Sequence, residues 1–357
     1  MANIWREWFR RKPELIQVPE HRSPGYNRWI ENGVKILRKE LPFEGAADVS
    51  ITLGSGVSAE SIMKYMGLGE KDVKHITYED IDLPIGVNKG HKKEIIAGVT
   101  KEGKKIILVN GRTHAYEIPE NGIKTRAWGE LGRMELATGY IAMLNEIGVE
   151  NMILTCAAGG INHPMNDGGE KPFDPDKLPV ISLIGADLND AYPSPNLSDY
   201  KSKAGDFFSL KDADPELMGM FEQSMKETGD DREIPKVYYI TSRSTPNFED
   251  PGVIYDVASK GGQVVGMSFS YEKEFISGMD HIGRFMGIAV VTNPVELDYK
   301  IQSPSRTFKS ISVNEIRQHR PQEFKKVFVS TDEEVKRMGR LANEKLGKGL
   351  AHLVARL

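Results

Sequence analysis

The sequence predicts an α/β fold: a single domain with a central mixed β-sheet flanked by helices. Three observations predict it. Short apolar runs bounded by glycine, asparagine or proline recur along the 357-residue chain, as strands do. Stretches with apolar residues every three or four positions lie between these runs and indicate helices that pack on a sheet. A hydrophobic content of 39% is enough to form a large core.

Eight segments are predicted as strands, at 48–53, 94–100, 104–110, 151–157, 179–185, 236–241, 263–268 and 287–293. The polar run "TKEGKK" at 100–105 indicates a turn, so the two strands beside it are expected to form an antiparallel hairpin. The clearest helix covers about 134–148, where Met134, Ala137, Ile141 and Leu144 share one face. Further helices are predicted at about 211–228, 251–260, 270–279 and 331–348.

Residues 46–357 are expected to form the α/β domain, and residues 1–45 a helical extension before it. The first 27 residues contain basic residues and tryptophans but no apolar run as long as a signal peptide or a membrane span requires. We interpret them as an arm packed on the domain; the alternative is a helix that binds a partner or a membrane surface. The aperiodic stretches 162–177 and about 298–329 are predicted to be loops or lids, the second an insertion.

Charge and cysteine content narrow the classes of function. The net charge of −4 argues against a basic field for nucleic acid or for an anionic membrane. Cys156 is the only cysteine, which excludes an intramolecular disulfide and a multi-cysteine metal site and favours a cytoplasmic location. No histidine pair has metal-ligand spacing, and the Asp-rich stretch 167–176 lacks that of a calcium loop. Small-molecule chemistry without a metal is therefore expected.

The stretch "VNGRTHAYE" at 109–117 follows a predicted strand and places Arg112, His114 and Tyr116 at every second position. This spacing predicts that the three side chains share one face of the strand. An arginine can donate two parallel hydrogen bonds to a phosphate, and a histidine can donate another. The alternative is that Arg112 pairs with a structural carboxylate and that His114 is a satisfied histidine of the sheet.

A glycine turn at "ITLGSGVSAE", residues 51–60, joins a predicted strand to a predicted helix. Backbone N–H groups at the start of a helix, together with the Ser55 hydroxyl, could hold a phosphate oxygen. Gly54, Gly56 and Ala59 also match a dinucleotide fingerprint, with an acid about 20 residues further on. A nicotinamide-dependent dehydrogenase would leave the motif at 109–117 without a role. A plain strand-to-helix turn is the third interpretation.

Two further groups of residues could contact a ligand. In "ILTCAAGGIN", residues 153–162, a predicted strand runs into small residues, which permit close approach of a ligand or tight packing. Ligands of open α/β sheets bind where strands end. Glu249 and Asn293 follow apolar runs and together could accept from and donate to the edge of a purine base. Individually, Glu249 also fits an acid at a helix N-terminus and Asn293 a strand-end cap.

In this order, the motifs resemble those of the trimeric purine nucleoside phosphorylase family, which includes methylthioadenosine phosphorylases. The resemblance covers roughly residues 46–295, with a weaker match at about 330–348. Seven segments carry it, and their sequences are "LGSG", "KGHKKE", "GRTHAYE", "AAGGIN", "FED", "GMS" and "TN". The resemblance implies a nucleoside phosphorylase-like domain, a purine nucleoside as substrate, and inorganic phosphate as co-substrate without any other cofactor. It also implies a homo-oligomer, either a trimer or a dimer of trimers.

The resemblance also implies a set of site residues. Phosphate would be bound by Ser55, His91, Arg112, His114, the backbone N–H of Ala157, and Ser268. The sugar would contact Tyr116 and Met267, and the base would contact Phe248, Glu249 and Asn293. Catalytic roles are implied for Asn293, Glu249 and His114. Family members that act on 6-oxopurines carry asparagine at the position of Asn293, whereas 6-aminopurine and methylthioadenosine enzymes tend to carry aspartate, so inosine or guanosine is the expected substrate.

Three positions depart from the family pattern. Cys156 stands where the family usually has asparagine, and Ala204 lies near the place of an aromatic residue that a neighbouring subunit lends to the sugar pocket. Asp332 is close to the position of a histidine that touches the 5′-hydroxyl, although Ser330 and Glu333 also fit a helix capping box there. The departures concern the 5′ end of the sugar. Two alternatives stay open: a methylthioadenosine-type phosphorylase, and a purine-nucleoside-binding protein that has lost turnover.

Overall fold

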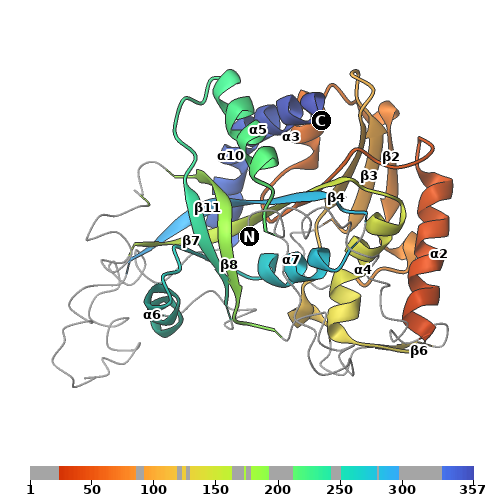
Figure 1. The fold of residues 1–357 in the computed structure, drawn as a ribbon, viewed down its shortest axis with the longest axis horizontal. Coiled ribbons are helices and arrows are strands. Elements are labelled where there is room, and N and C mark those ends of the chain that lie inside the picture. Colours follow the sequence, from red (N-terminus) through yellow and green to blue (C-terminus); the bar gives the residue numbers. More distant parts are fainter. Residues whose placement is uncertain are drawn as a thin grey trace, which may run out of the picture.

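A nine-stranded mixed sheet runs through the middle of the molecule, in the order β10-β9-β8-β11-β7-β1-β4-β3-β2 (Figure 1). This is a computed structural model, and the residues it describes are 24–85, 92–118, 123–125, 129–162, 173, 178–192, 212–242, 251–279, 281–296 and 332–357. The mixed sheet with helices on its faces confirms the predicted fold class.

All eight predicted strands are present, and the parallel centre of the sheet consists of β4 (Lys105–Asn110), β1 (Val49–Leu53), β7 (Asn151–Asn162) and β11 (Arg284–Glu296). The predicted hairpin is confirmed, because β3 (Glu94–Val99) runs antiparallel to β4. Beyond β3 lies β2 (Val73–Thr77), which the pattern of apolar residues does not predict. Only Ile76 of β2 is buried, so this edge strand carries almost no apolar signal. A separate two-stranded sheet, β5 (Ile123–Thr125) and β6 (Gly129–Leu131), was also not predicted.

The remaining strands close part of the sheet into a ring. They are β8 (Val180–Asn189), β9 (Lys236–Thr241) and β10 (Val264–Gly266). Because β10 pairs with both β9 and β7, strands β7, β11, β8, β9 and β10 form a closed cycle of pairings, and closure removes exposed edges. This closure also explains why β7 continues to Asn162, five residues past its predicted end at residue 157.

The glycines of β7 allow this close packing. Gly159 and Gly160 pair with β10 on one side and with β11 on the other. A Cβ atom on Gly160 would lie 2.6 Å from ring carbons of Phe173 and 2.7 Å from the Val291 side chain. Tight packing, one of the two interpretations of this segment, is therefore correct for Gly160.

Helices cover both faces of the sheet (Figure 1). One face carries α2 (Pro24–Glu40), α4 (Arg133–Glu146) and α7 (Phe269–Ser277); the other carries α3 (Ala59–Tyr65), α5 (Pro215–Glu227) and α10 (Asp332–Arg356). Helix α6 (Pro251–Ser259) packs against the ring strands. Alternate residues of β4 face opposite layers: Ile107 and Val109 pack with the α2–α4–α7 layer, and Ile106 and Leu108 with the α3–α5–α10 layer.

Helix α2 belongs to the same hydrophobic core as α4. The Trp29 side chain is 1% exposed, and its indole N–H donates to the Asp82 carbonyl at 2.9 Å. Gly139 of α4 permits the contact, because a Cβ atom there would lie 2.2 Å from the Trp29 ring. Over residues 24–40 the chain therefore packs on the domain. The boundary at residue 45 stays a prediction, and residues 1–23 and 297–331, which include the predicted insertion, lie outside the described residues.

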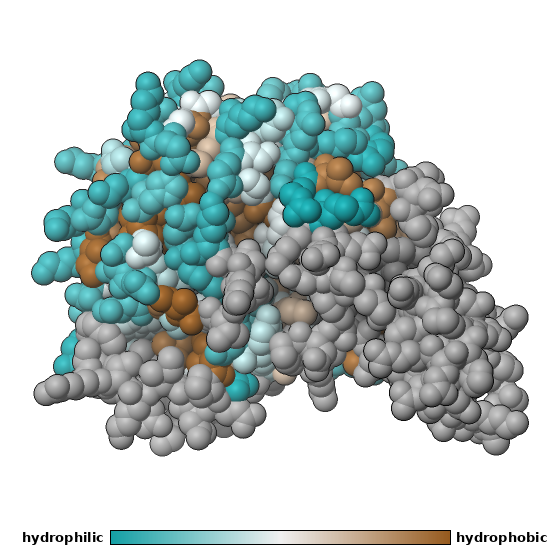
Figure 2. Space-filling model, turned by 180° about the vertical axis from the view of Figure 1, so that it is seen from behind, coloured by the Kyte–Doolittle hydropathy of each residue, from teal (hydrophilic) through white to brown (hydrophobic). Residues whose placement is uncertain are grey.

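The described surface is mainly polar. Seen from behind, hydrophilic side chains cover most of its upper part, with apolar side chains between them (Figure 2). Among the described residues, the large hydrophobic side chains that are exposed are Ile85, Val99 and Leu341. Single apolar residues on a surface are normal in globular proteins. None of the helices in the described segments has the length and apolarity needed to cross a membrane.

Candidate active site

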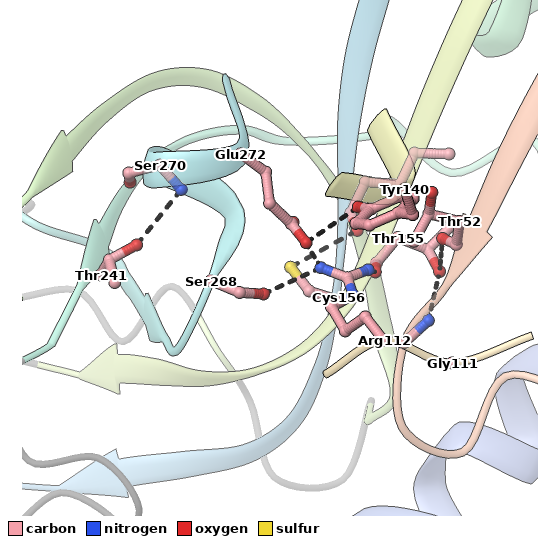
Figure 3. Close-up of polar contacts among 12 residues, drawn as sticks. Thr52, Gly111, Arg112, Tyr140, Thr155, Cys156, Thr241, Ser268, Ser270 and Glu272 are labelled. Carbon is pink, nitrogen blue, oxygen red and sulfur yellow. Dashed lines mark hydrogen bonds and ion pairs between the residues drawn. The ribbon is translucent and has the colours of Figure 1, made fainter. Parts of the chain in front are cut away.

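Two of the predicted phosphate ligands, Arg112 and Ser268, are buried and contact each other (Figure 3). Arg112 lies just after β4, and its side chain is 1% exposed. Its Nη1 donates to Ser268 Oγ at 2.8 Å and to the Glu272 carboxylate at 2.6 Å, while Nη2 donates to the Thr155 carbonyl at 2.5 Å. Arg112 and Ser268 are 156 positions apart in the sequence, so the fold brings them together.

Glu272, which no sequence motif predicts as part of the site, neutralises Arg112. Its carboxylate is 1% exposed and also accepts a hydrogen bond from the Tyr140 hydroxyl at 3.0 Å. Burial, helped by the nearby Glu272 charge, raises the pKa of Tyr140 well above its ordinary value, so the phenol stays a donor. The interpretation that Arg112 pairs with a structural carboxylate is therefore correct. Arg112 makes this ion pair and the hydrogen bond to Ser268 at the same time.

Ser268 is held in place by the start of α7. The Ser270 N–H donates to Thr241 Oγ1 of β9 at 3.2 Å, and the Ser270 hydroxyl donates to the Leu188 carbonyl of β8 at 3.1 Å. These bonds fix the first turn of α7 on the ring strands, and the bond to Thr241 is drawn in Figure 3. Ser268, one residue before the helix, is 2% exposed and faces Arg112, and Met267 beside it is half-buried.

The predicted alternation of Arg112, His114 and Tyr116 along a strand is wrong. β4 ends before Gly111, whose φ of +99° turns the chain, and a single helical turn follows His114. The Glu117 carboxylate accepts from the His114 backbone N–H at 2.9 Å and caps that turn. His114 and Tyr116 nevertheless lie together, because their rings stack with centroids 5.1 Å apart at an interplanar angle of 19°.

A second buried ion pair holds the other end of this loop. The Lys93 ammonium donates to the Arg112 carbonyl and to Thr113 Oγ1, and lies 3.6 Å from the Glu117 carboxylate. The Lys93 and Glu117 side chains are 6% and 0% exposed. Burial lowers the pKa of Lys93, against the opposing effect of Glu117. Residues 111–117 are thus held by one buried ion pair at Arg112 and another at Glu117.

The loop that carries Ser55 leaves the sheet beside the Arg112 loop. Leu53 at the end of β1 is in register with Asn110 at the end of parallel β4, so both loops emerge at the same edge of the sheet, where ligands of α/β folds bind. The Gly54 N–H donates to Thr155 Oγ1 at 2.9 Å. Only glycine fits at position 54, because a Cβ atom there would lie 2.7 Å from the Cys156 Cα.

Thr155 connects the two loops. Its hydroxyl accepts from Gly54 and donates to the Thr52 carbonyl at 3.0 Å, and its own carbonyl accepts from Arg112. The residue is fully buried in β7. Thr155 therefore contacts both the loop that carries Ser55 and the guanidinium of Arg112. Ser55 itself is half-buried.

Cys156, one of the departures from the family pattern, is an inert thiol. It is buried, and its Sγ donates to the Ile288 carbonyl at 3.8 Å. Burial raises the pKa of Cys156 to about 12, so it does not ionise at neutral pH. The next residue, Ala157, is half-buried in β7.

Other predicted positions fall on residues that the structure does not describe in full. His91, Phe248, Glu249 and Ala204 lie outside the described residues. Asn293 is placed by its backbone only: it pairs with Gly159 immediately after a register shift in β11. Asp332 is the first residue of α10. Within the described part of the chain, no group of three or more His, Cys, Asp or Glu side chains could hold a metal ion.

Comparisons with known proteins point to one family. No family model matches the chain. Purine nucleoside phosphorylase 1 of Bacillus subtilis (strain 168) is 28% identical over 266 residues, which cover 74% of this chain and 84% of that protein. The enzyme of the same name from Geobacillus stearothermophilus is 26% identical over 272 residues, with the same coverage, and purine nucleoside phosphorylase of Bos taurus is 25% identical over 264 residues, with 72% and 80% coverage.

Solved structures support the fold. The crystal structure of a schistosoma purine nucleoside phosphorylase in complex with hypoxanthine has a TM-score of 0.61 and 20% identity, covering 92% of this chain and 96% of that chain. A schistosoma purine nucleoside phosphorylase in complex with guanosine has a TM-score of 0.61 and 19% identity, with 92% and 97% coverage. Over about three quarters of its length, this chain is similar in sequence to curated purine nucleoside phosphorylases, and it shares the fold of the solved ones.

Proposed function

We propose that this chain catalyses the phosphorolysis of purine nucleosides. Phosphate attacks C1′ of the ribose, the bond from C1′ to the purine nitrogen breaks, and the products are ribose 1-phosphate and the free base. The observation that carries the proposal is the convergence of the Arg112–Ser268 pair and the Ser55 loop on Thr155 at one edge of the sheet. These elements come from separate parts of the chain, and the fold brings the Ser55 loop and the Arg112–Ser268 pair to the same residue, Thr155.

Phosphate is the nucleophile and also an electrostatic partner. Breaking the glycosidic bond develops positive charge on the sugar, which a bound dianion stabilises. Ser268 Oγ accepts a hydrogen bond from Arg112, and its hydroxyl hydrogen, which also bonds to Glu272, would turn to donate to a phosphate oxygen in this proposal. In this proposal Arg112 therefore acts on phosphate partly through Ser268. Ser55, His91, His114 and the Ala157 N–H complete the phosphate ligands.

The sugar and the base lie above the phosphate. Tyr116, stacked on His114, and Met267 contact the ribose in this proposal. Asn293 hydrogen-bonds N7 and O6 of the purine as negative charge builds there, Glu249 accepts from the ring N–H, and Phe248 packs on the base. Loss of one such donor typically raises the barrier by about 3 to 4 kcal/mol. The asparagine at 293 supports a preference for inosine and guanosine, because it can donate to a 6-oxo group.

Release of the base from a panel of nucleosides tests this function. Purified protein is incubated with inosine, guanosine, adenosine and methylthioadenosine, with and without phosphate. We expect release of hypoxanthine and guanine only when phosphate is present. Release without phosphate would identify a hydrolase, and preferred cleavage of methylthioadenosine would identify the other branch of the family. No release from any of the four would favour the alternative of a purine-nucleoside-binding protein without turnover.

The base specificity is tested by Asn293→Asp. This change replaces an amide donor by an acceptor, so the ratio of kcat/KM for inosine to that for adenosine is expected to fall at least tenfold. Asn27→Asp is a matched control, because Asn27 is exposed on α2, on a helix that contributes no proposed ligand. An unchanged ratio in Asn293→Asp would remove Asn293 from the base site.

The proposal includes a cytoplasmic homo-oligomer, a trimer or a dimer of trimers, in line with the family resemblance. Light scattering on the purified protein measures this directly. A monomer that is fully active at assay concentration would contradict the assembly and leave the reaction in place.

A further inference from the structure

Helix α10 packs against the loop that carries Ser55. Its apolar stripe, Ala342, Leu346 and Leu350, is buried in the hydrophobic layer between the sheet and helices α3 and α5. Because this stripe is at most 2% exposed, the helix has a defined position on the sheet. Polar side chains beside the stripe are held equally firmly. Asn343, next to Ala342, is 7% exposed.

The amide of Asn343 binds the backbone of the loop twice. Its Nδ2 donates to the Gly56 carbonyl at 3.1 Å, and its Oδ1 accepts from the Ser58 N–H at 2.9 Å. These partners fix the orientation of the amide, because the flipped form would place donor against donor and acceptor against acceptor. Ser58 is where the loop ends, since its hydroxyl accepts from the Ser61 N–H and caps α3.

The backbone of α10 also touches the loop, one turn before Asn343. A Cβ atom on Gly339 would lie 2.7 Å from the Gly56 Cα, and its three nearest atoms would all be backbone atoms of Gly56. Gly56 itself has a φ of +81°, a conformation that residues with side chains rarely adopt. The turn at Gly56 is thus enclosed by the helix on the side of Gly339 and Asn343.

We propose that Asn343 and Gly339 are positioning residues for phosphate: α10 sets the conformation of the loop 54–58 and thereby the place of the Ser55 hydroxyl. The inference rests on the proposed function, in which Ser55 binds phosphate. Thr155 holds the start of the loop through Gly54, and Asn343 holds its end through Gly56 and Ser58. If one end is released, the Ser55 hydroxyl samples more positions, and phosphate binding must then offset the entropy of ordering it.

Two variants of α10 test this role. Asn343→Leu keeps roughly the size of the side chain and removes both bonds to the loop. Gly339→Ala keeps the amide and pushes a methyl group against the Gly56 backbone. For each we expect the KM for phosphate to rise about tenfold, as the loss of one or two hydrogen bonds predicts. The KM for the nucleoside at saturating phosphate should change less than twofold, and circular dichroism should show a folded protein.

Matched controls come from the same contacts. Ser61→Ala removes a hydrogen bond from α3 to the Asn343 carbonyl, 3.3 Å long, and leaves the loop bonds intact. Gly349→Ala makes the same change as Gly339→Ala ten residues later on α10, where the new methyl group meets the end of the Met225 side chain, which can move, rather than the loop. Both controls should keep the KM for phosphate of the unaltered protein.

The outcomes separate this inference from the proposed function. The inference is overturned if Asn343→Leu and Gly339→Ala fold and keep the original KM for phosphate. It is also overturned if, in these variants, the KM for phosphate and the KM for the nucleoside rise equally. If the unaltered protein releases no base, the proposed function fails, and calorimetric titration with inorganic phosphate replaces the kinetic readout. Weaker phosphate binding by Asn343→Leu than by the unaltered protein supports the inference. Equal binding, or no binding by either, overturns it.

Discussion

The two halves of the candidate phosphate site are held by different kinds of interaction. The Arg112 half is held by charge: its guanidinium pairs with Glu272 in the layer of α4 and α7, where both side chains are 1% exposed. The Ser55 half is held by neutral groups, the hydroxyl of Thr155 at the start of its loop and the amide of Asn343 at the end.

Because one half is held by charges and the other by neutral groups, changes in the two halves should affect stability and function to different extents. Removing one partner of a buried ion pair leaves an uncompensated charge and costs about 3 to 5 kcal/mol, whereas a neutral hydrogen bond contributes about 1 kcal/mol. A change at the Arg112 half therefore disturbs folding and the site together. A change at the Ser55 half can shift the site in a protein that still folds, which makes it the better place to alter phosphate binding alone.

The largest effect is expected for Glu272→Ala. It leaves the Arg112 charge buried without its carboxylate, so the free energy of unfolding should fall by about 3 to 5 kcal/mol in urea titrations. Phosphorolysis should be lost. The double variant Arg112→Met with Glu272→Leu should regain much of the stability, because apolar residues replace both charges, but none of the activity. A single variant as stable as the unaltered protein would show that the pair does not hold this half.

A smaller effect is expected for Thr155→Val. The change keeps the shape of a fully buried side chain but leaves the Gly54 N–H without its acceptor and the Thr52 carbonyl without its donor. The free energy of unfolding should fall by about 1 to 3 kcal/mol, and the KM for phosphate should rise. Thr155→Ser, which keeps the hydroxyl, is the control. If Thr155→Val and Thr155→Ser had equal free energies of unfolding and equal KM values for phosphate, the hydroxyl would not hold the loop.

A weaker electrostatic effect is expected outside both halves, at His75 on β2. Its ring lies 3.0 Å from the carboxylates of Glu94 and Glu70, and the bond to Glu94 is the main reason that its pKa is raised. Because the folded-state pKa is raised, protonated His75 stabilises the fold below the unfolded value of about 6.5, and this contribution is lost as pH rises through the folded value. Solvent screening limits it to a few tenths of a kcal/mol.

The measurement compares the unaltered protein with His75→Gln in urea at pH 5.5 and pH 8.5. The difference in free energy of unfolding between them should be larger at pH 5.5, with kcat/KM unchanged at both. A difference that grows with pH would have the wrong sign for a histidine paired with carboxylates.

The smallest effect is expected for the thiol of Cys156. Its pKa of about 12 and its burial beside Arg112 predict that a thiol reagent at pH 8 leaves the folded protein unlabelled and fully active. Labelling should reach one group per chain only after unfolding in urea. Rapid labelling of the native protein, with loss of activity, would place the thiol in an open site.

Local patterns predicted the strands and the site segments but not what supports them. The strands were found because their apolar runs are buried on one or both faces, and β2, with only Ile76 buried, was missed for the opposite reason. The alternation drawn through Arg112 and Tyr116 failed because Gly111 ends the extended chain, as glycines before turns can. A positive φ at this glycine is not visible in a pattern of hydrophobicity.

The supporting residues were missed because their partners are far away in the sequence. Glu272 is 160 positions from Arg112, and the sequence around either residue does not predict that the two pair. A polar residue on the buried face of a helix is the one local signal available, and it applies to Glu272 on α7 and to Asn343 on α10. Glu249, Phe248 and His91 stay predictions, since they lie outside the described residues.

The distance along the chain between the Ser55 loop and α10 has a consequence for how the protein matures in the cell. Ser58 and Asn343 are 285 positions apart, and at a translation rate of about 5 to 20 residues per second, roughly 14 to 57 s pass between their syntheses. We expect β1 and β4 to pair while the ribosome is still at work, with the Ser55 loop unformed until α10 arrives. Chains stalled before residue 343 should therefore lack the ordered Ser55 loop and bind phosphate more weakly than the full chain.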